Sequence, residues 1–233
     1  MSIADVWWWP IPATVHSQDL APLSYAENQR VSRAKSSATK AAIAGARVTV
    51  RRILSEVLGV PPEGIELGRL PCPGCADAHH GPPAVLLPAT SLRISISHTA
   101  GCAALAVSRE PVGVDVEQRR NLPVERLSRV VLSGSEREHL AAHPEGPERD
   151  REFLRCWTRK EAVLKAVGIG IATNLTEVET RPGSVGPVDV EAGARAGAAE
   201  LWSVTDLELP EPWQGALAVR AGQTGAVRVH KHE

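Results

Sequence analysis

The sequence predicts an α+β fold made of two similar subdomains, each a long helix packed on a small sheet. Each half contains one long amphipathic helix, at 38–58 and at 151–167, followed by short apolar strands. The strands Cys102-Ala-Ala-Leu-Ala-Val107 and Gln214-Gly-Ala-Leu-Ala-Val219, near the end of each half, are also alike. Two similar subdomains leave a crevice between them, which is a common place for a ligand.

The length and composition of the chain limit which architectures and which classes of partner are expected. A chain of 233 residues is long enough for two cores, which we expect in an N-terminal subdomain at 1–109 and a C-terminal one at 110–233. The net charge of −1 gives no overall basic field, so neither a nucleic acid nor a membrane surface is an expected partner. Because Met1 to Pro10 lacks a secretory pattern, we expect a cytoplasmic protein with reduced cysteines.

The first half contains a helix, a loop and two strands. Apolar residues recur at helical spacing over 38–58, and Gly59 ends that helix. Residues 71–84 are rich in Pro, Gly, Cys and His, a composition typical of a loop. Apolar and polar residues alternate over 92–97, which predicts a half-buried strand, and 103–107 predicts a second one.

The second half begins with a strand at 112–117, in which valines alternate with Gly113, Asp115 and Glu117. Two short helices are expected next, the second with Ser135 and Glu138 as a capping box. After the helix at 151–167, short strands and a Gly/Ala-rich flexible connection complete the chain. The ranges are 123–131 and 135–142 for the short helices, 175–180, 201–205 and 216–220 for the strands, and 181–198 for the connection.

The loop contains a possible metal-binding pattern. Cys72 and Cys75 are separated by Pro-Gly, and His79 and His80 follow closely, so thiolate and imidazole groups are available for zinc. A turn with two reduced thiols explains the same residues, because only one CxxC pair is present.

Asp115 and Glu117 fall on one face of their strand, since alternate side chains project to the same side. Two carboxylates at this spacing suit Mg²⁺, with substrate phosphate and water as further ligands. A solvated outer face of an antiparallel strand is the competing interpretation.

The second long helix carries charges at or beside its apolar stripe. Lys160 falls inside the stripe, while Glu161 and Lys165 lie along its edge and are spaced to form an ion pair. Charges on the inward side of a helix need partners, and a metal-phosphate centre would supply them. An ion pair on the helix flank, with Lys160 extending to solvent, is the alternative.

Further cationic groups precede these motifs. His98, at the end of a predicted strand, is a candidate phosphate ligand or a structural histidine. Lys40, Arg47 and Arg51 give the first long helix a basic character, and Arg47 and Arg51 share a face that could hold another phosphate. For any one of these residues, a solvated basic face is the more common explanation. P-loop, G-x-S-x-G and G-x-G-x-x-G signatures are missing.

Two motifs resemble those of 4′-phosphopantetheinyl transferases. They are Gly113-Val-Asp115-Val-Glu117 and the run Trp157-Thr-Arg-Lys160-Glu161-Ala-Val-Leu-Lys165-Ala-Val-Gly168. Ser97-His98-Thr99, upstream of the first motif, and the chain length resemble the surfactin-synthetase-activating (Sfp) type. This type is a monomeric pseudo-dimer of two α+β subdomains.

The resemblance implies transfer of 4′-phosphopantetheine from coenzyme A to a serine of an acyl or peptidyl carrier protein, releasing 3′,5′-ADP. Such carriers serve fatty-acid, polyketide or nonribosomal peptide synthesis. The residues that match the family's functional positions fall into three groups. Asp115, Glu117 and Glu161 would hold Mg²⁺ or Mn²⁺; Glu161, Lys160 and Lys165 would be catalytic; Ser97, His98, Lys40, Arg47, Arg51, Lys160 and Lys165 would bind coenzyme A.

One position departs from the family pattern. Pro82 stands where the family has a basic residue, so a side-chain contact to coenzyme A is not expected there. Two other functions remain open: a Mg²⁺-dependent phosphodiesterase that acts on coenzyme A or a nucleotide, and a non-catalytic module whose CxxC loop holds zinc.

Overall fold

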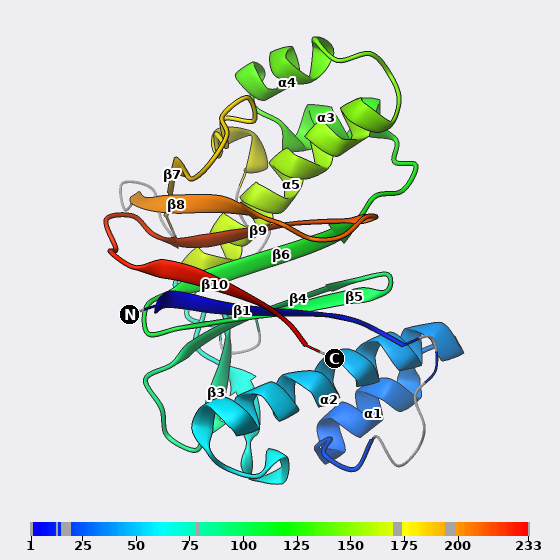
Figure 1. Ribbon diagram of the computed structural model, residues 1–233, viewed down its shortest axis with the longest axis vertical. Coiled ribbons are helices and arrows are strands. Elements are labelled where there is room, and N and C mark those ends of the chain that lie inside the picture. The colour runs from blue at the N-terminus through cyan, green and yellow to red at the C-terminus, as the bar shows by residue number, and fades with distance from the viewer. Residues whose placement is uncertain are drawn as a thin grey trace.

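The computed structural model is an α+β protein, as the sequence predicts, and contains two four-stranded sheets. It describes residues 2–12, 14, 20–77, 80–169, 174–193 and 199–232. The two sheets lie one above the other in the middle of the molecule, and helices cover their outer sides (Figure 1). None of the helices in these ranges combines the length and apolar character required to cross a membrane.

The first sheet contains strands from both ends of the chain. Its order is β10-β1-β5-β4, formed by β1 (Ser2–Pro10), β4 (Arg93–Thr99), β5 (Cys102–Ser108) and β10 (Ala226–Lys231). β5 pairs antiparallel with both β1 and β4, whereas β10 pairs parallel to β1. The final strand therefore crosses the division expected at residue 109, because it returns to the sheet of the N-terminal half.

The second sheet is antiparallel throughout and has the order β6-β9-β8-β7. Its strands are β6 (Val112–Gln118), β7 (Val188–Ala192), β8 (Glu200–Leu207) and β9 (Trp213–Arg220). The two similar apolar segments noted in the sequence form β5 and β9, which are inner strands of their respective sheets.

Two helices cover the first sheet. α2 (Ser37–Leu58) begins at the N-cap Ser36 and ends at Gly59, which has a φ of +67°. Its apolar side packs on β4 and β5 in one core cluster, and α1 (Tyr25–Arg33) packs against α2. A small hairpin of β2 (Glu66–Arg69) and β3 (Pro83–Leu87) lies beside this layer, and its connecting loop carries the CxxC motif.

The second sheet is covered by α5 (Pro147–Val167), with α3 (Val124–Val131) and α4 (Gly134–Ala141) beside it. α5 crosses β6 at very short range because Gly113 has no side chain: a Cβ there would overlap the carbonyl oxygen of Ala162. This close approach brings the face of β6 that carries Asp115 and Glu117 up to α5.

The two sheets are joined through β4 and β6 by a row of hydroxyl groups. Ser95 Oγ accepts a hydrogen bond from the N–H of Val114 at 3.0 Å, and Thr99 Oγ1 accepts one from Gln118 at 3.1 Å. The serines of β4, which the alternating pattern places on its polar face, are therefore buried. An apolar cluster that includes Val112, Val114 and Val116 fills the space between the sheets.

Several sequence predictions are confirmed and others are wrong. Both long helices, both short helices and five of the six predicted strands are present. The segment 175–180 is not a strand: it contains a 3₁₀ turn, Leu175–Glu177, capped by Asn174. The connection at 181–198 contains β7, and the capping box of α4 is Ser133 with Glu136, two residues earlier than expected.

Candidate active site

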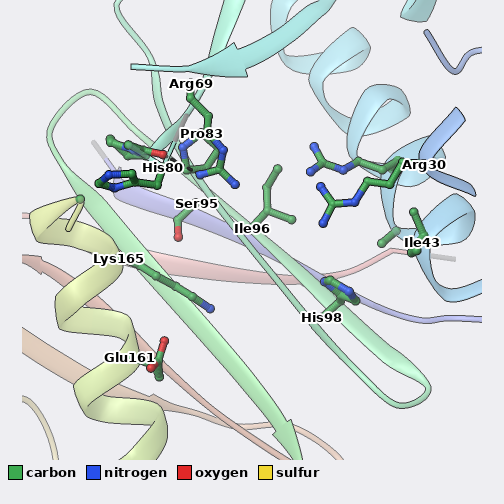
Figure 2. A pocket seen from close by; sticks show the side chains of 15 residues that line it. Arg30, Ile43, Arg69, His80, Pro83, Ser95, Ile96, His98, Glu161 and Lys165 are labelled. Carbon is green, nitrogen blue, oxygen red and sulfur yellow. Dashed lines mark hydrogen bonds between the residues drawn. The ribbon is translucent and has the colours of Figure 1, made fainter. Parts of the chain in front are cut away.

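A pocket of about 300 Å³ lies where the layer of α1 and α2 meets α5. Glu161 and Lys165 extend from α5 on one side, and Arg30 and His98 lie on the opposite side (Figure 2). The pocket draws on α1, α2, β2, β4, α5 and the loop before β3. Its lining is Arg30, Ile43, Ala46, Arg47, Arg69, His80, Gly81, Pro82, Pro83, Ser95, Ile96, His98, Glu161, Lys165 and Gly168.

Lys165 is anchored at the wall of the pocket by β4 and β6. Its Nζ lies 2.6 Å from Asp115 Oδ1 and donates to Ser97 Oγ at 2.9 Å. Ser97 Oγ in turn donates to Asp115 Oδ1 at 2.8 Å. Three predicted site residues, from three elements, thus form one network.

Two carboxylate oxygens beside this network have no hydrogen-bond partner among the described residues, although both are buried. They are Asp115 Oδ2 and Glu161 Oε1. Burial, with the negative charges of Asp115 and Glu117, raises the pKa of Glu161 to about 7. Buried, mutually repelling oxygens that lack partners fit a divalent cation, because hard oxygen donors are what Mg²⁺ prefers.

Glu117 lies at the outer end of this acidic group. Thr99 Oγ1 donates to Glu117 Oε2 at 3.2 Å, and burial, with the charge of Asp115, raises the pKa of Glu117. Across the described ranges, no three carboxylates bring one oxygen each within 4.8 Å of one another. Asp115, Glu117 and Glu161 are therefore electrostatic neighbours without the contact spacing of a filled metal centre.

The opposite side of the pocket is strongly basic. Burial lowers the pKa of His98, and the positive charges of Arg47, Lys165 and Arg30 lower it further. Burial also lowers the pKa of Arg47, and the charges of Arg30 and Arg69 act in the same direction. Cations that repel one another around one cavity favour an anionic ligand with more than one charge.

Lys160 is not part of this pocket, which corrects the expectation that it faces the substrate. It is fully buried on another side of α5, where Nζ lies 2.6 Å from Glu136 Oε2. Nζ also donates to the carbonyl oxygens of Leu175 (at 2.9 Å) and Val178. The sequence predicted that Lys160 points inward, but its partners are protein groups rather than a phosphate.

Arg51 and Lys40 also lie away from the pocket lining. Arg51 is buried and pairs with Glu27, its Nη2 lying 2.8 Å from Oε2, and it donates to the carbonyl oxygens of Pro62 and Ile65. Lys40 is exposed near the start of α2. Of the three predicted basic residues of this helix, only Arg47 lines the pocket.

Arg30 and Arg69 also line the pocket, although neither is among the site residues predicted from the sequence. Arg69 Nη1 donates to the carbonyl oxygen of Gly81 at 2.6 Å, beside Pro82. Arg69 thus brings a guanidinium to the loop at which Pro82 offers no charge. No local pattern marks either arginine, because the elements that carry them, α1 and β2, were not predicted.

Comparisons with known proteins show similarity over most of the chain. Residues 111–218 match the family model described as the 4′-phosphopantetheinyl transferase superfamily. The chain is 30% identical over 225 residues to 4′-phosphopantetheinyl transferase HetI of Nostoc sp., an alignment that covers 92% of this chain and 87% of that protein. It is 24% identical over 143 residues to a 4′-phosphopantetheinyl transferase of Bacillus subtilis (61% and 58% covered). It is 27% identical over 134 residues to 4′-phosphopantetheinyl transferase psf-1 of Bacillus pumilus (58% and 53% covered).

Proposed function

Because the chain belongs to the 4′-phosphopantetheinyl transferase superfamily, a family of transferases, we propose that it transfers 4′-phosphopantetheine from coenzyme A to a serine of an acyl or peptidyl carrier protein. The reaction would release 3′,5′-ADP. One observation carries the proposal: the pocket has cations on one side and Glu161 on the other, and Glu161 and its neighbour Asp115 each have a buried carboxylate oxygen without a partner among the described residues. This arrangement suits a polyphosphate held together with a divalent cation.

The basic side of the pocket would hold the nucleotide end of coenzyme A. His98, Arg47 and Arg30 lie together there, and the burial of His98 and Arg47 favours a ligand that replaces their lost hydration with negative charge. Arg69 would add a further contact beside the loop at 80–83. These residues bind and orient coenzyme A so that its pyrophosphate reaches α5.

The acidic side would hold Mg²⁺, or Mn²⁺ in its place, through Asp115, Glu117 and Glu161. When bound, the ion supplies positive charge that stabilises a breaking phosphoanhydride bond. Lys165, already fixed by Asp115 and Ser97, would stabilise the bisphosphate as it leaves.

Glu161 is the proposed proton acceptor. The serine oxygen of the carrier forms a bond to the phosphorus next to pantetheine, and the bond from that phosphorus to the bridging oxygen of the pyrophosphate breaks. The hydroxyl proton passes to Glu161, directly or through a water molecule.

Mass spectrometry of apo carrier proteins, incubated with the protein, coenzyme A and Mg²⁺, tests the proposal. One phosphopantetheine should be added per carrier, and only when Mg²⁺ is present. Failure to modify any acyl or peptidyl carrier would refute the transfer. Release of 3′,5′-ADP from coenzyme A without a carrier would instead identify a phosphodiesterase.

Glu161→Gln separates proton transfer from binding. The expected variant binds coenzyme A but transfers the group about 10²–10⁴-fold more slowly. Glu148→Gln, at an exposed position in the first turn of the same helix, is the matched control and should behave as the unmodified protein. Near-normal transfer by Glu161→Gln would contradict its role as base.

A further inference from the structure

A second group of metal-ligating side chains lies at the edge of the pocket, in the loop between β2 and β3. The ligand atoms of Cys72, Cys75 and His80 all lie within 4.8 Å of one another. Cys75 Sγ is 3.3 Å from His80 Nε2. Both cysteines are free thiols; Cys72 is buried, and Cys75 and His80 are exposed.

The backbone of this loop folds tightly around the sulfur of Cys72. The N–H of Ala76 donates to the carbonyl oxygen of Cys72 at 2.7 Å, and Ala76 has a φ of +63°, which is unusual for a residue other than glycine. The N–H groups of Cys75 and Gly74 donate to the Cys72 sulfur.

We propose that Cys72, Cys75 and His80 bind one Zn²⁺ ion. Two sulfurs from a C-x₂-C turn and one imidazole nitrogen suit zinc and not Mg²⁺, which prefers oxygen. A water molecule would complete the tetrahedron. His79, the other histidine of the motif, lies outside the described residues.

The zinc would fix the loop that forms one wall of the coenzyme pocket. The metal ligand His80 lines the pocket itself, and so do Gly81 and Pro82, which follow it in the chain. The loop closes on itself through the N–H of Leu70, which donates to the carbonyl oxygen of Pro82 at 2.9 Å. It also reaches the end of α5, because a Cβ at Gly168 would lie 3.1 Å from the ring of Pro82.

Arg69 depends on the same loop. The carbonyl oxygen of Gly81 accepts its Nη1 hydrogen bond, so the position of this carbonyl sets the direction of the guanidinium. The zinc site is therefore a positioning device for the wall that carries Arg69. This consequence for coenzyme A rests on the proposed function, whereas binding of the metal does not.

Metal analysis of the full-length protein, purified without a polyhistidine tag, tests the site. We expect one zinc per chain that survives dialysis, and Co²⁺ in its place should give the intense thiolate-to-cobalt absorption of a two-sulfur site. Cys75→Ser and His80→Ala change exposed side chains, so they should fold but lose the zinc and the absorption. Cys102→Ala, at a buried thiol in β5, is the control and should retain both.

The outcomes separate the metal site from its role. A folded protein that holds no zinc and gives no cobalt-thiolate absorption would overturn the site, as would zinc that dialyses equally from the unmodified protein and from Cys75→Ser. Removal of zinc should weaken binding of coenzyme A, measured by calorimetry, about tenfold or more. Unchanged affinity would overturn the positioning role alone. A protein that binds zinc but modifies no carrier would refute the transferase and leave the site standing.

Discussion

Two lysines that are five residues apart on α5 belong to two different charge clusters, one fully buried and one at the wall of the pocket. Lys160 lies in a closed cluster with Glu136 and the carbonyl oxygens of Leu175 and Val178, where burial is complete. Lys165 lies in an open cluster with Asp115 and Ser97, at the wall of a pocket.

The difference lies in what each cluster leaves unpaired. The carboxylate of Glu136 pairs with Lys160 and accepts from Ser133 and Thr180, so both its oxygens have partners. In the open cluster, Asp115 Oδ2 and Glu161 Oε1 have none among the described residues. A closed cluster stabilises the fold, whereas an open one is available to a ligand.

Lys160→Met should give the largest effect and should reveal a structural role. Removing one partner from a buried ion pair leaves Glu136 charged and uncompensated, which typically costs about 3–5 kcal/mol of unfolding free energy. Urea denaturation followed by circular dichroism measures this loss. The double variant Lys160→Met with Glu136→Leu should recover part of the stability, because it leaves no unpaired charge.

A loss of transfer without a loss of stability in Lys160→Met would contradict this interpretation. It would mean that the closed cluster opens during the reaction and that Lys160 reaches the substrate, as the sequence motif suggested.

Lys165→Met should show the converse pattern. We expect the transfer rate to fall about 10²–10³-fold, equivalent to about 3–4 kcal/mol of transition-state stabilisation, because a positioned cation is lost from the leaving group. The unfolding free energy should fall less than in Lys160→Met, because the Lys165 side chain is one-quarter exposed whereas Lys160 is fully buried; some loss is expected, since the buried Asp115 loses its cation. Lys165→Arg, which keeps the charge, should recover part of the rate.

Helical periodicity could not distinguish the two lysines. Ten residues in α5, from Phe153 to Leu164, are buried, so this helix has no solvated side over most of its length. The partners that decide the roles are distant in sequence: Glu136 for Lys160, Asp206 for Arg159 and Asp115 for Lys165. The sequence shows that inward charges need partners, but only the fold supplies them.

The orientation of Asp115 and Glu117 on β6, in contrast, could be predicted because it depends only on neighbouring residues of the strand. Strand alternation has a period of two, so the buried valines place Asp115 and Glu117 together on the other face. In contrast, the pairing of β1 with β10 joins the two ends of the chain, and no local pattern specifies such a contact. The arginines on α1 and β2 were missed because those elements were also not predicted.

Arg47 and Arg51 on α2 also differ in this way: Arg47 lines the pocket, whereas Arg51 is buried and paired with Glu27. Arg47→Met should weaken coenzyme A binding by about 1.5–3 kcal/mol, the contribution of a hydrogen bond to a charged group, without loss of stability. Arg51→Met should leave binding unchanged and lower the unfolding free energy, because Glu27 loses its partner. Calorimetric titration and urea denaturation of both variants measure the two effects. Equal losses of affinity in both would show that the pocket extends to Arg51.

His98 should give the smallest effect and a diagnostic pH dependence. Its pKa lies below the usual 6.5 in the free protein, because it is buried among cations. A bound phosphate would neutralise those cations and raise the pKa of His98, so the complex holds more protons than the free protein. The affinity for coenzyme A should therefore fall as the pH rises from the pKa of the free protein to that of the complex.

His98→Gln should weaken the binding free energy for coenzyme A by about 1 kcal/mol and abolish the part of the proton uptake that comes from the imidazole. Calorimetry of coenzyme A binding in buffers of different ionisation enthalpy measures that uptake directly. The family resemblance implies that His98 contacts the 3′-phosphate of coenzyme A, so dephospho-coenzyme A, which lacks that group, should show little uptake with either protein. If the unmodified protein takes up no more protons than His98→Gln, the imidazole does not face the bound phosphate and the basic side of the pocket acts through its arginines alone.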